Sequence, residues 1–193
     1  MNMETERFEA LIDAILAIII TIIVMDIPLT ETTSLTSLLQ LYPDFIAYTI
    51  SFLICFFVWY YHHNLFNIVN KLNSTITWTS AMMIILVGLL PHTTTMLANN
   101  YYSFTAQAVF GLLFYVTIIN AFLVEKLLIK TDKANIALQV VAKNRKKFTQ
   151  KIIIIIIITY ILAYLYYPPT IIIGCLITLT LNYLPKDKIR LPI

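Results

Sequence analysis

Two carboxylates, Asp13 and Asp26, flank an apolar run near the start of the chain. The run holds about twelve residues, and a helix of that length spans roughly 18 Å, whereas the hydrocarbon core of a bilayer is roughly 30 Å thick. A membrane helix at this position therefore places at least one carboxylate at membrane depth. Charged groups there are costly, and they face a bundle interior or a water-filled path. This spacing marks the first helix as the candidate functional centre.

Between the two carboxylates, one face of the expected helix carries branched and long apolar side chains. Ile18, Ile22 and Met25 stand at positions i, i+4 and i+7 and form one stripe, and Thr21 lies beside it with a single hydroxyl. Such stripes are found most often where helices pack together, and a narrow apolar pore needs the same kind of wall. Residue spacing alone leaves both interpretations open.

The whole chain has the composition of an integral membrane protein. Of its 193 residues, 60% are hydrophobic and 12% are charged. Soluble domains have about half and about a quarter of these types. A chain of this length holds roughly five to seven spans and no large soluble enzyme domain. Cys55 and Cys175 lie within apolar runs, which is typical of buried thiols rather than of a disulfide or metal pair, and we expect no cofactor and no metal.

Uninterrupted apolar stretches predict an all-α protein with six transmembrane helices in a single membrane domain, residues 1–193. The stretches lack the alternation of apolar and polar residues that a β-barrel requires. The predicted spans are about 8–28, 43–66, 76–97, 103–128, 150–167 and 169–185.

The positive residues fall on one predicted side of the membrane. All 13 Lys and Arg lie before the first span, between the second and third, between the fourth and fifth or at the facing ends of these two, or after the sixth. This pattern predicts that both termini are cytoplasmic in a multi-pass protein of the cell membrane. The formal charge of +3 then indicates anionic lipid at the cytoplasmic face as a partner, and not nucleic acid.

The start of the first span resembles a known signature. Arg7, then three residues, then Leu11, Ile12 and Asp13 are similar to the Arg-x-x-x-Phe-Ser-Asp motif of the transmembrane protein 175 family of potassium channels. Leu11 and Ile12 replace the family's Phe and Ser. The Arg and Asp are kept.

Further positions extend the resemblance. Trp59, His62 and His63 resemble the family's Trp-x-x-His-His pattern, and Pro91 ends the third span where the family also has a proline. Arg7 and Asp13 are too far apart around the helix for an i, i+4 pair, so we expect Asp13 to find a partner on the second span, with His62 or His63 as candidates.

The resemblance implies the function of a potassium channel. Single-repeat bacterial members assemble as homotetramers with the first helix lining a central pore. The pore constriction then falls on Ile18, Ile22 and Met25, and cation selectivity on Thr21. Asp26 would add a ring of negative charge at the outer mouth. The sequence contains no Thr-Val-Gly-Tyr-Gly filter, so potassium would pass an apolar constriction instead of a cage of carbonyls.

Other function classes stay open beside the channel. A secondary transporter would have broken helices and an internal repeat. A non-conducting membrane protein of the same six-span architecture would have the same hydropathy. A membrane-embedded enzyme would need convergent polar residues deep in several spans, and the sequence offers few. We therefore expect a channel and not an enzyme.

Overall fold

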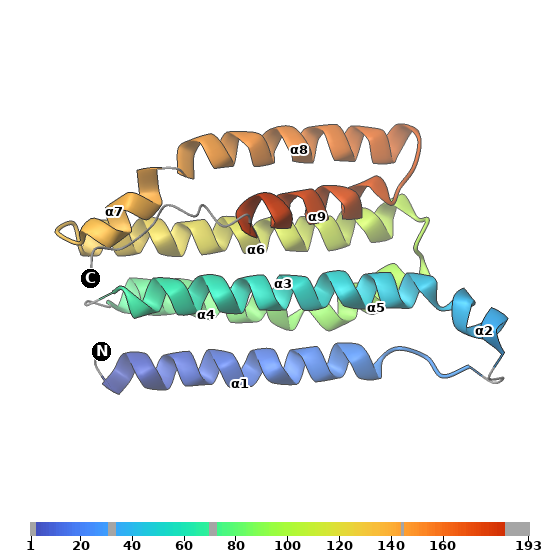
Figure 1. Cartoon of the computed structure of the whole chain (residues 1–193), viewed down its shortest axis with the longest axis horizontal. Helices are drawn as coiled ribbons and strands as arrows, with labels where there is room; N and C mark the ends of the chain where they lie inside the picture. Colours follow the sequence, from blue (N-terminus) through green and yellow to red (C-terminus); the bar gives the residue numbers. More distant parts are fainter. Residues whose placement is uncertain (1–2, 31–33, 70–72, 144, 184–193) are drawn as a thin grey trace.

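The structure is a computed structural model that describes residues 3–30, 34–69, 73–143 and 145–183. Its regular elements in these ranges are α-helices, which run roughly parallel or antiparallel to one another (Figure 1). In chain order they are α1 (Met3–Met25), α2 (Leu35–Gln40), α3 (Tyr42–Asn67), α4 (Ser74–Gly88), α5 (Leu90–Asn99), α6 (Phe104–Thr131), α7 (Ile136–Lys143), α8 (Arg145–Leu165) and α9 (Thr170–Tyr183).

The predicted spans all contain helix, but the helices differ in length. Four segments are long and apolar enough to cross a membrane, namely Arg7–Met25, Tyr42–Asn67, Ser74–Asn99 and Phe104–Thr131. The last two predicted spans contain shorter apolar helices, Thr149–Leu165 and Thr170–Leu181. The all-helical class is therefore confirmed for the described residues. Six crossings and the cytoplasmic placement of both termini stay predictions.

The third predicted span consists of two helices in place of one. α4 ends at Gly88, and α5 begins at Leu90 with Pro91 in its first turn. A proline has no backbone N–H to donate and its ring clashes with the preceding turn, so a helix restarts there more easily than it continues. The backbone N–H of Leu89 donates to the carbonyl of Leu86 at 3.2 Å, which keeps the junction tight.

Two short helices occupy segments that the sequence predicts as connections. α2 begins after Ser34, whose hydroxyl accepts the backbone N–H of Ser37 at 3.1 Å as an N-cap. α7 lies between α6 and α8. Both are too short to give a clear helical periodicity in the sequence.

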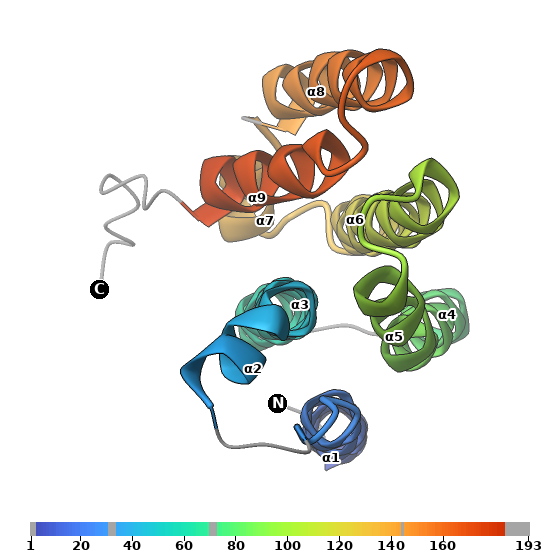
Figure 2. The same cartoon turned by 90° about the vertical axis from the view of Figure 1, so that its right-hand side faces the viewer.

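α1 lies at one edge of the bundle and α8 at the opposite edge (Figure 2). α1 contacts α3, α4 and α5. Its buried side chains, spaced i, i+4, i+7 and i+11, are Ile12, Leu16, Ile19 and Ile23. This stripe forms the main packing surface of α1 against the rest of its own protomer. Phe8, Ile15 and Ile20 flank this stripe and pack partly against the core, whereas Ile18, Ile22 and Met25 are exposed.

On the far side of the bundle, α8 and α9 form a hairpin that packs on α6, with one glycine at the contact with α6 and another inside the hairpin. A Cβ added to Gly111 would lie 2.4 Å from Cγ2 of Ile171. A Cβ added to Gly174 would lie 2.7 Å from Cγ2 of Thr159. Gly111 therefore allows the hairpin to approach α6 closely, and Gly174 allows α8 and α9 to approach each other.

Candidate pore-lining helix

The predicted pore stripe faces away from its own protomer. Ile18, Ile22 and Met25 are 57%, 44% and 81% exposed, whereas the neighbouring Ile19 and Ile23 are buried. We call Ile18, Ile22 and Met25 the exposed ridge of α1. The ridge is therefore not part of the core of one chain, and what covers it must be a second molecule, lipid or water.

Thr21 stands beside this ridge with a fixed orientation of its hydroxyl. Its Oγ1 donates to the backbone carbonyl of Ile18 at 2.7 Å. A threonine hydroxyl has one proton and two lone pairs, so this bond uses the proton and leaves the oxygen as an acceptor. An exposed acceptor oxygen is suited to a cation or to the water around it.

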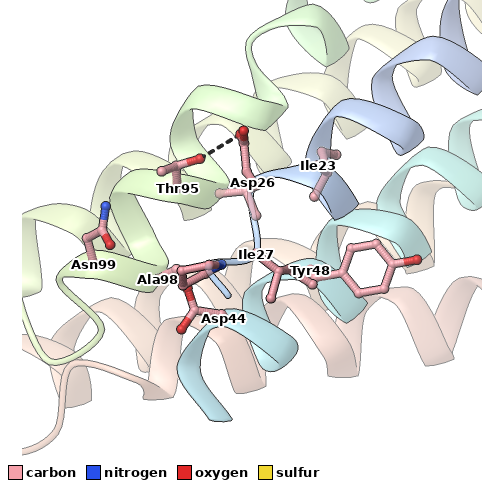
Figure 3. Close-up of a pocket in the computed structure, with 10 residues that line it drawn as sticks. Ile23, Asp26, Ile27, Asp44, Tyr48, Thr95, Ala98 and Asn99 are labelled. Carbon is pink, nitrogen blue, oxygen red and sulfur yellow. Dashed lines mark hydrogen bonds between the residues drawn. The ribbon is translucent and has the colours of Figure 1, made fainter. Parts of the chain in front are cut away.

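The C-terminal end of α1 carries a carboxylate that accepts a hydrogen bond from a second helix. Oγ1 of Thr95, on α5, donates to Oδ2 of Asp26 at 3.0 Å. Asp26 also borders an open pocket of about 250 Å³, which Asp44 of α3 lines as well (Figure 3). The ten lining residues include these two carboxylates and no lysine, arginine or histidine. The C-terminal ends of α1 and α5 carry partial negative charge and the N-terminal end of α3 carries partial positive charge, so the two carboxylates account for most of the attraction for cations there.

A tyrosine near this end does not change that charge. Tyr101 lies in the turn between α5 and α6, and its partial burial raises the pKa of its phenol above the ordinary value. A phenol with a raised pKa is neutral at physiological pH. Tyr101 therefore contributes no negative charge beside Asp26 and Asp44.

The N-terminal part of α1 contacts α3 through a different polar pair from the one expected. Nδ1 of His63 lies 2.6 Å from Oε1 of Glu9. Asp13, the predicted partner, is exposed, and the described contacts bring neither Arg7 nor Asp13 to a histidine. Glu9 and Asp13 stand four residues apart on nearly the same face of α1, so the vertical register of α1 against α3 decides which of them meets the imidazole.

The other motif residues on α3 lie around this pair. The ring of Trp59 stacks on that of His63, with centroids 5.4 Å apart and an interplanar angle of 9°. His62 is only 3% exposed and stacks on Phe66, and its ring nitrogens have no hydrogen-bond partner among the described residues. Its position indicates a packing role in the bundle and not a ligand.

Polar contacts between other helices were not predicted. Glu125 of α6 is buried and accepts a hydrogen bond from the hydroxyl of Tyr61 on α3. Ser51 of α3 and Thr94 of α5 share a buried hydrogen bond of 2.7 Å. No local spacing in the sequence marks these pairs, because each joins residues far apart in the chain.

Comparison with known proteins adds three findings. Residues 7–91 match the family model described as the endosomal/lysosomal potassium channel TMEM175. A protein of Chryseobacterium sp. (strain P1-3) named as a potassium channel is 31% identical over 182 residues, which cover 94% of this chain and 93% of that protein. A second protein named as a potassium channel, from Chamaesiphon minutus, is 33% identical over 102 residues, which cover 50% of this chain and 50% of that protein.

A solved structure shares the fold. The crystal structure of a lysosomal potassium-selective channel TMEM175 homolog from Chamaesiphon minutus superposes with a TM-score of 0.78. The alignment covers 93% of this chain and 96% of that chain at 21% sequence identity. The arrangement of helices in Figures 1 and 2 is therefore one that a known protein adopts.

Proposed function

The chain belongs to the TMEM175 family, and from this premise we propose that it is a potassium-permeable cation channel whose pore is lined by α1. The family signature at Arg7 and Asp13 and the Trp59, His62 and His63 pattern lie within the matched residues 7–91. The relatives are named as potassium channels, which are not enzymes.

The exposed ridge of α1 is the observation that supports this assignment to α1. One stripe of the helix is buried against its own protomer, and a different face presents Ile18, Ile22 and Met25, which are largely exposed. In a homotetramer, four copies of this ridge would surround a central axis. We place the narrowest point at Ile18, where a ring of branched aliphatic groups excludes water when the pore is shut.

Selection among cations would then depend on few oxygens. Large cations lose less than small ones by shedding water, so potassium passes an apolar constriction more easily than sodium. Thr21 supplies a ring of acceptor oxygens because its proton is donated to the carbonyl of Ile18. One hydroxyl per protomer replaces only part of a hydration shell, so the selectivity is modest.

Asp26 would act at the outer mouth. Its carboxylate is fixed by Thr95 at the end of α1, beside a pocket without basic side chains. A ring of such carboxylates raises the local concentration of cations and repels anions. This arrangement supports cation conduction in particular.

The proposal includes the setting of the protein. The chain would form a homotetramer in the cell membrane, with six spans per subunit and both termini in the cytoplasm. Anionic lipid would bind the lysines at the cytoplasmic ends of the spans, such as Lys130 in the last turn of α6. Potassium is the permeating ion, and we propose no cofactor.

A secondary transporter is the second candidate, because the third predicted span consists of two helices. The break between α4 and α5 is the kind of discontinuity that transporters use to bind ions with unwound backbone. Here, however, the backbone N–H of Leu89 donates a hydrogen bond to the carbonyl of Leu86. The junction therefore keeps a helical turn and is not an unwound segment. The break favours a channel with a bent helix over a backbone ion site.

A flux experiment tests the proposed function. We expect purified protein in liposomes under a potassium gradient to carry a current that reverses near the potassium equilibrium potential. Liposomes that stay impermeable to alkali cations would contradict the proposal. A current that appears only after a second substrate is added would favour the transporter.

Cross-linking tests the placement of α1. Both native cysteines, Cys55 and Cys175, are buried, so a new exposed cysteine reports on its own position. Met25→Cys on the ridge should give covalent dimers under mild oxidation. Val24→Cys, which is exposed on the same helix but off the ridge, is the matched control and should give fewer. Equal yields would show that the ridge does not face an axis.

A further inference from the structure

The short helix α2 is amphipathic, and its apolar side is exposed. Successive residues of an α-helix are rotated by about 100°, so Leu35, Leu38 and Leu39 fall on one side of α2. We call these three residues the leucine face of α2, and they are 73%, 48% and 65% exposed. A helix that packs on its own chain in water turns its apolar side toward the core. The leucine face instead leaves much of its apolar surface for something outside the protomer.

The polar side of α2 is the side nearer to its own chain. Ser37 is half-buried, whereas the other residues of α2 are exposed. The backbone N–H of Ser37 donates to the hydroxyl of Ser34 at 3.1 Å, and the two hydroxyls lie 2.8 Å apart. The helix itself packs on α3. Because Ser37 lies on the opposite side of α2 from the leucine face, that face turns away from the protomer.

A cluster of tyrosines indicates the level of α2 along the bundle. Tyr42 is the first residue of α3 and follows α2 closely in the chain. The hydroxyls of Tyr42 and Tyr102 lie 2.5 Å apart. The ring centroids of Tyr42 and Tyr101 are 5.8 Å apart, and those of Tyr102 and Tyr167 are 6.1 Å apart. Tyrosines are enriched where a membrane protein crosses the lipid–water interface, so α2 lies at the level of that interface.

At this level α2 lies beside the bundle, next to the apolar surface of a membrane span. Figure 1 shows α2 beyond the start of α3, at the same end as the turn between α8 and α9. In Figure 2 it projects from α3 on the side away from α5 and α6. Phe45, in the first turn of α3, is 47% exposed, and Phe52 and Phe56 further along are 38% and 39% exposed. Because α3 is long and apolar enough to cross a membrane, the leucine face continues a surface that the bilayer covers.

The composition of α2 indicates which part of the lipid it contacts. Its residues are Leu-Thr-Ser-Leu-Leu-Gln, and none of them is charged. Interfacial helices that bind anionic headgroups carry Lys or Arg on the polar side. The polar side of α2 carries hydroxyl and amide groups, which form hydrogen bonds with water and with headgroups of any charge. The leucine face therefore favours the apolar chains of the lipid, whatever the headgroup.

From these observations we propose that α2 is a lipid anchor. It lies along the lipid–water interface at the Asp26 end of the bundle, with the leucine face inserted among the acyl chains just below the headgroups. The sequence predicts that this is the outer leaflet. Insertion removes the leucine face from water, and this hydrophobic gain holds the helix in place. The anchor also fixes one end of residues 26–34, which connect α1 to α2.

Spin-label depth measurements test the proposal on the full-length protein in phosphatidylcholine liposomes. Both native cysteines are buried, so a nitroxide attaches to a cysteine introduced on α2. Leu35→Cys labels the centre of the leucine face, and Gln40→Cys is the matched control on the polar side. Since a helix with its side chains is about 10 Å wide, the label at Leu35 should lie about 10 Å deeper than the label at Gln40. Leu39→Cys, at an intermediate angle, should fall between them. Depth is measured from the relative accessibility of each label to oxygen and to a water-soluble nickel complex.

Three outcomes would overturn the inference. Equal depths for the labels at Leu35, Leu39 and Gln40, or shallower labels on the leucine face, would show that this face meets water. Labels on the leucine face that are shielded from both oxygen and nickel would show that a second protomer covers it. Depths that change when phosphatidylglycerol is added would show that headgroup charge, and not the acyl chains, sets the position of α2. These measurements do not depend on ion conduction, so they are independent of the proposed function.

Discussion

Replacement of Ile18 by asparagine is the sharpest test of the constriction. Exposing an isoleucine side chain fully to water costs about 1.5–3 kcal/mol. Because 57% of Ile18 is exposed on the free side of α1, wetting that surface costs about 1 kcal/mol per subunit. In a tetramer the four Ile18 side chains of the ring together oppose water entry by about 4 kcal/mol, and an amide side chain removes most of this penalty.

The expected change in flux is large even if only part of that penalty limits conduction. A barrier reduction of about 1 kcal/mol raises a rate about fivefold. Ile18→Asn should therefore carry at least about five times the wild-type potassium flux in liposomes. The assay compares initial flux rates at equal amounts of reconstituted protein, with folding checked by gel filtration and helical circular dichroism.

A control on the same helix makes the result specific. Val24 is 42% exposed and lies off the ridge, so Val24→Asn places the same polar group on α1 without lining the proposed axis. Its flux should stay near the wild-type value. Unchanged flux in Ile18→Asn, or an equal rise in Val24→Asn, would refute the assignment of the gate.

Three further predictions concern charge, selectivity and packing. Asp26→Asn should lower flux about two- to threefold at low salt, because a charge about 7 Å from an ion in water contributes about 0.6 kcal/mol, and the loss should disappear at about 1 M salt. Thr21→Val should lower the ratio of potassium to sodium flux, measured as bi-ionic reversal potentials, and Thr21→Ser should keep it, because only the valine removes the acceptor oxygen. Gly111→Ala should destabilise the fold by about 1–3 kcal/mol in thermal unfolding, since its Cβ would lie 2.4 Å from Ile171. Gly88→Ala, with nothing within 4 Å, should not, and similar losses in both would argue against this packing.

Hydropathy was sufficient to predict the class of the fold, because a chain rich in long apolar runs satisfies its backbone in a membrane mainly as helices. It was also sufficient to find which residues of α1 share a face. Whether that face is buried could not be read from the stripe, since Ile18 and Ile19 are the same residue type on different sides. Tertiary contacts decide that question.

The sequence did not predict which side chains contact one another between helices. Asp13 was expected to meet a histidine, and Glu9 does so, because a shift of one helical turn exchanges two carboxylates of similar character. The restart of the third span near Pro91 depends on a proline that is visible in the sequence, but the position of the break at Leu89 depends on the local backbone. The hydrogen bond between Tyr61 and Glu125 joins two helices, and no local pattern in the sequence predicts it.

The short hairpin of α8 and α9 has a consequence for the surrounding lipid. The 14 residues of α9 that the structure describes reach about 21 Å, less than the hydrocarbon thickness of roughly 30 Å. If α8 and α9 cross the bilayer as the sequence predicts, acyl chains next to this side of the protein would have to compress, or headgroups would have to move toward the hairpin, whereas the longer helices on the other side match a normal bilayer. The six-span arrangement would then thin the membrane on one side of the protein only, and it would favour thinner lipid regions on that side.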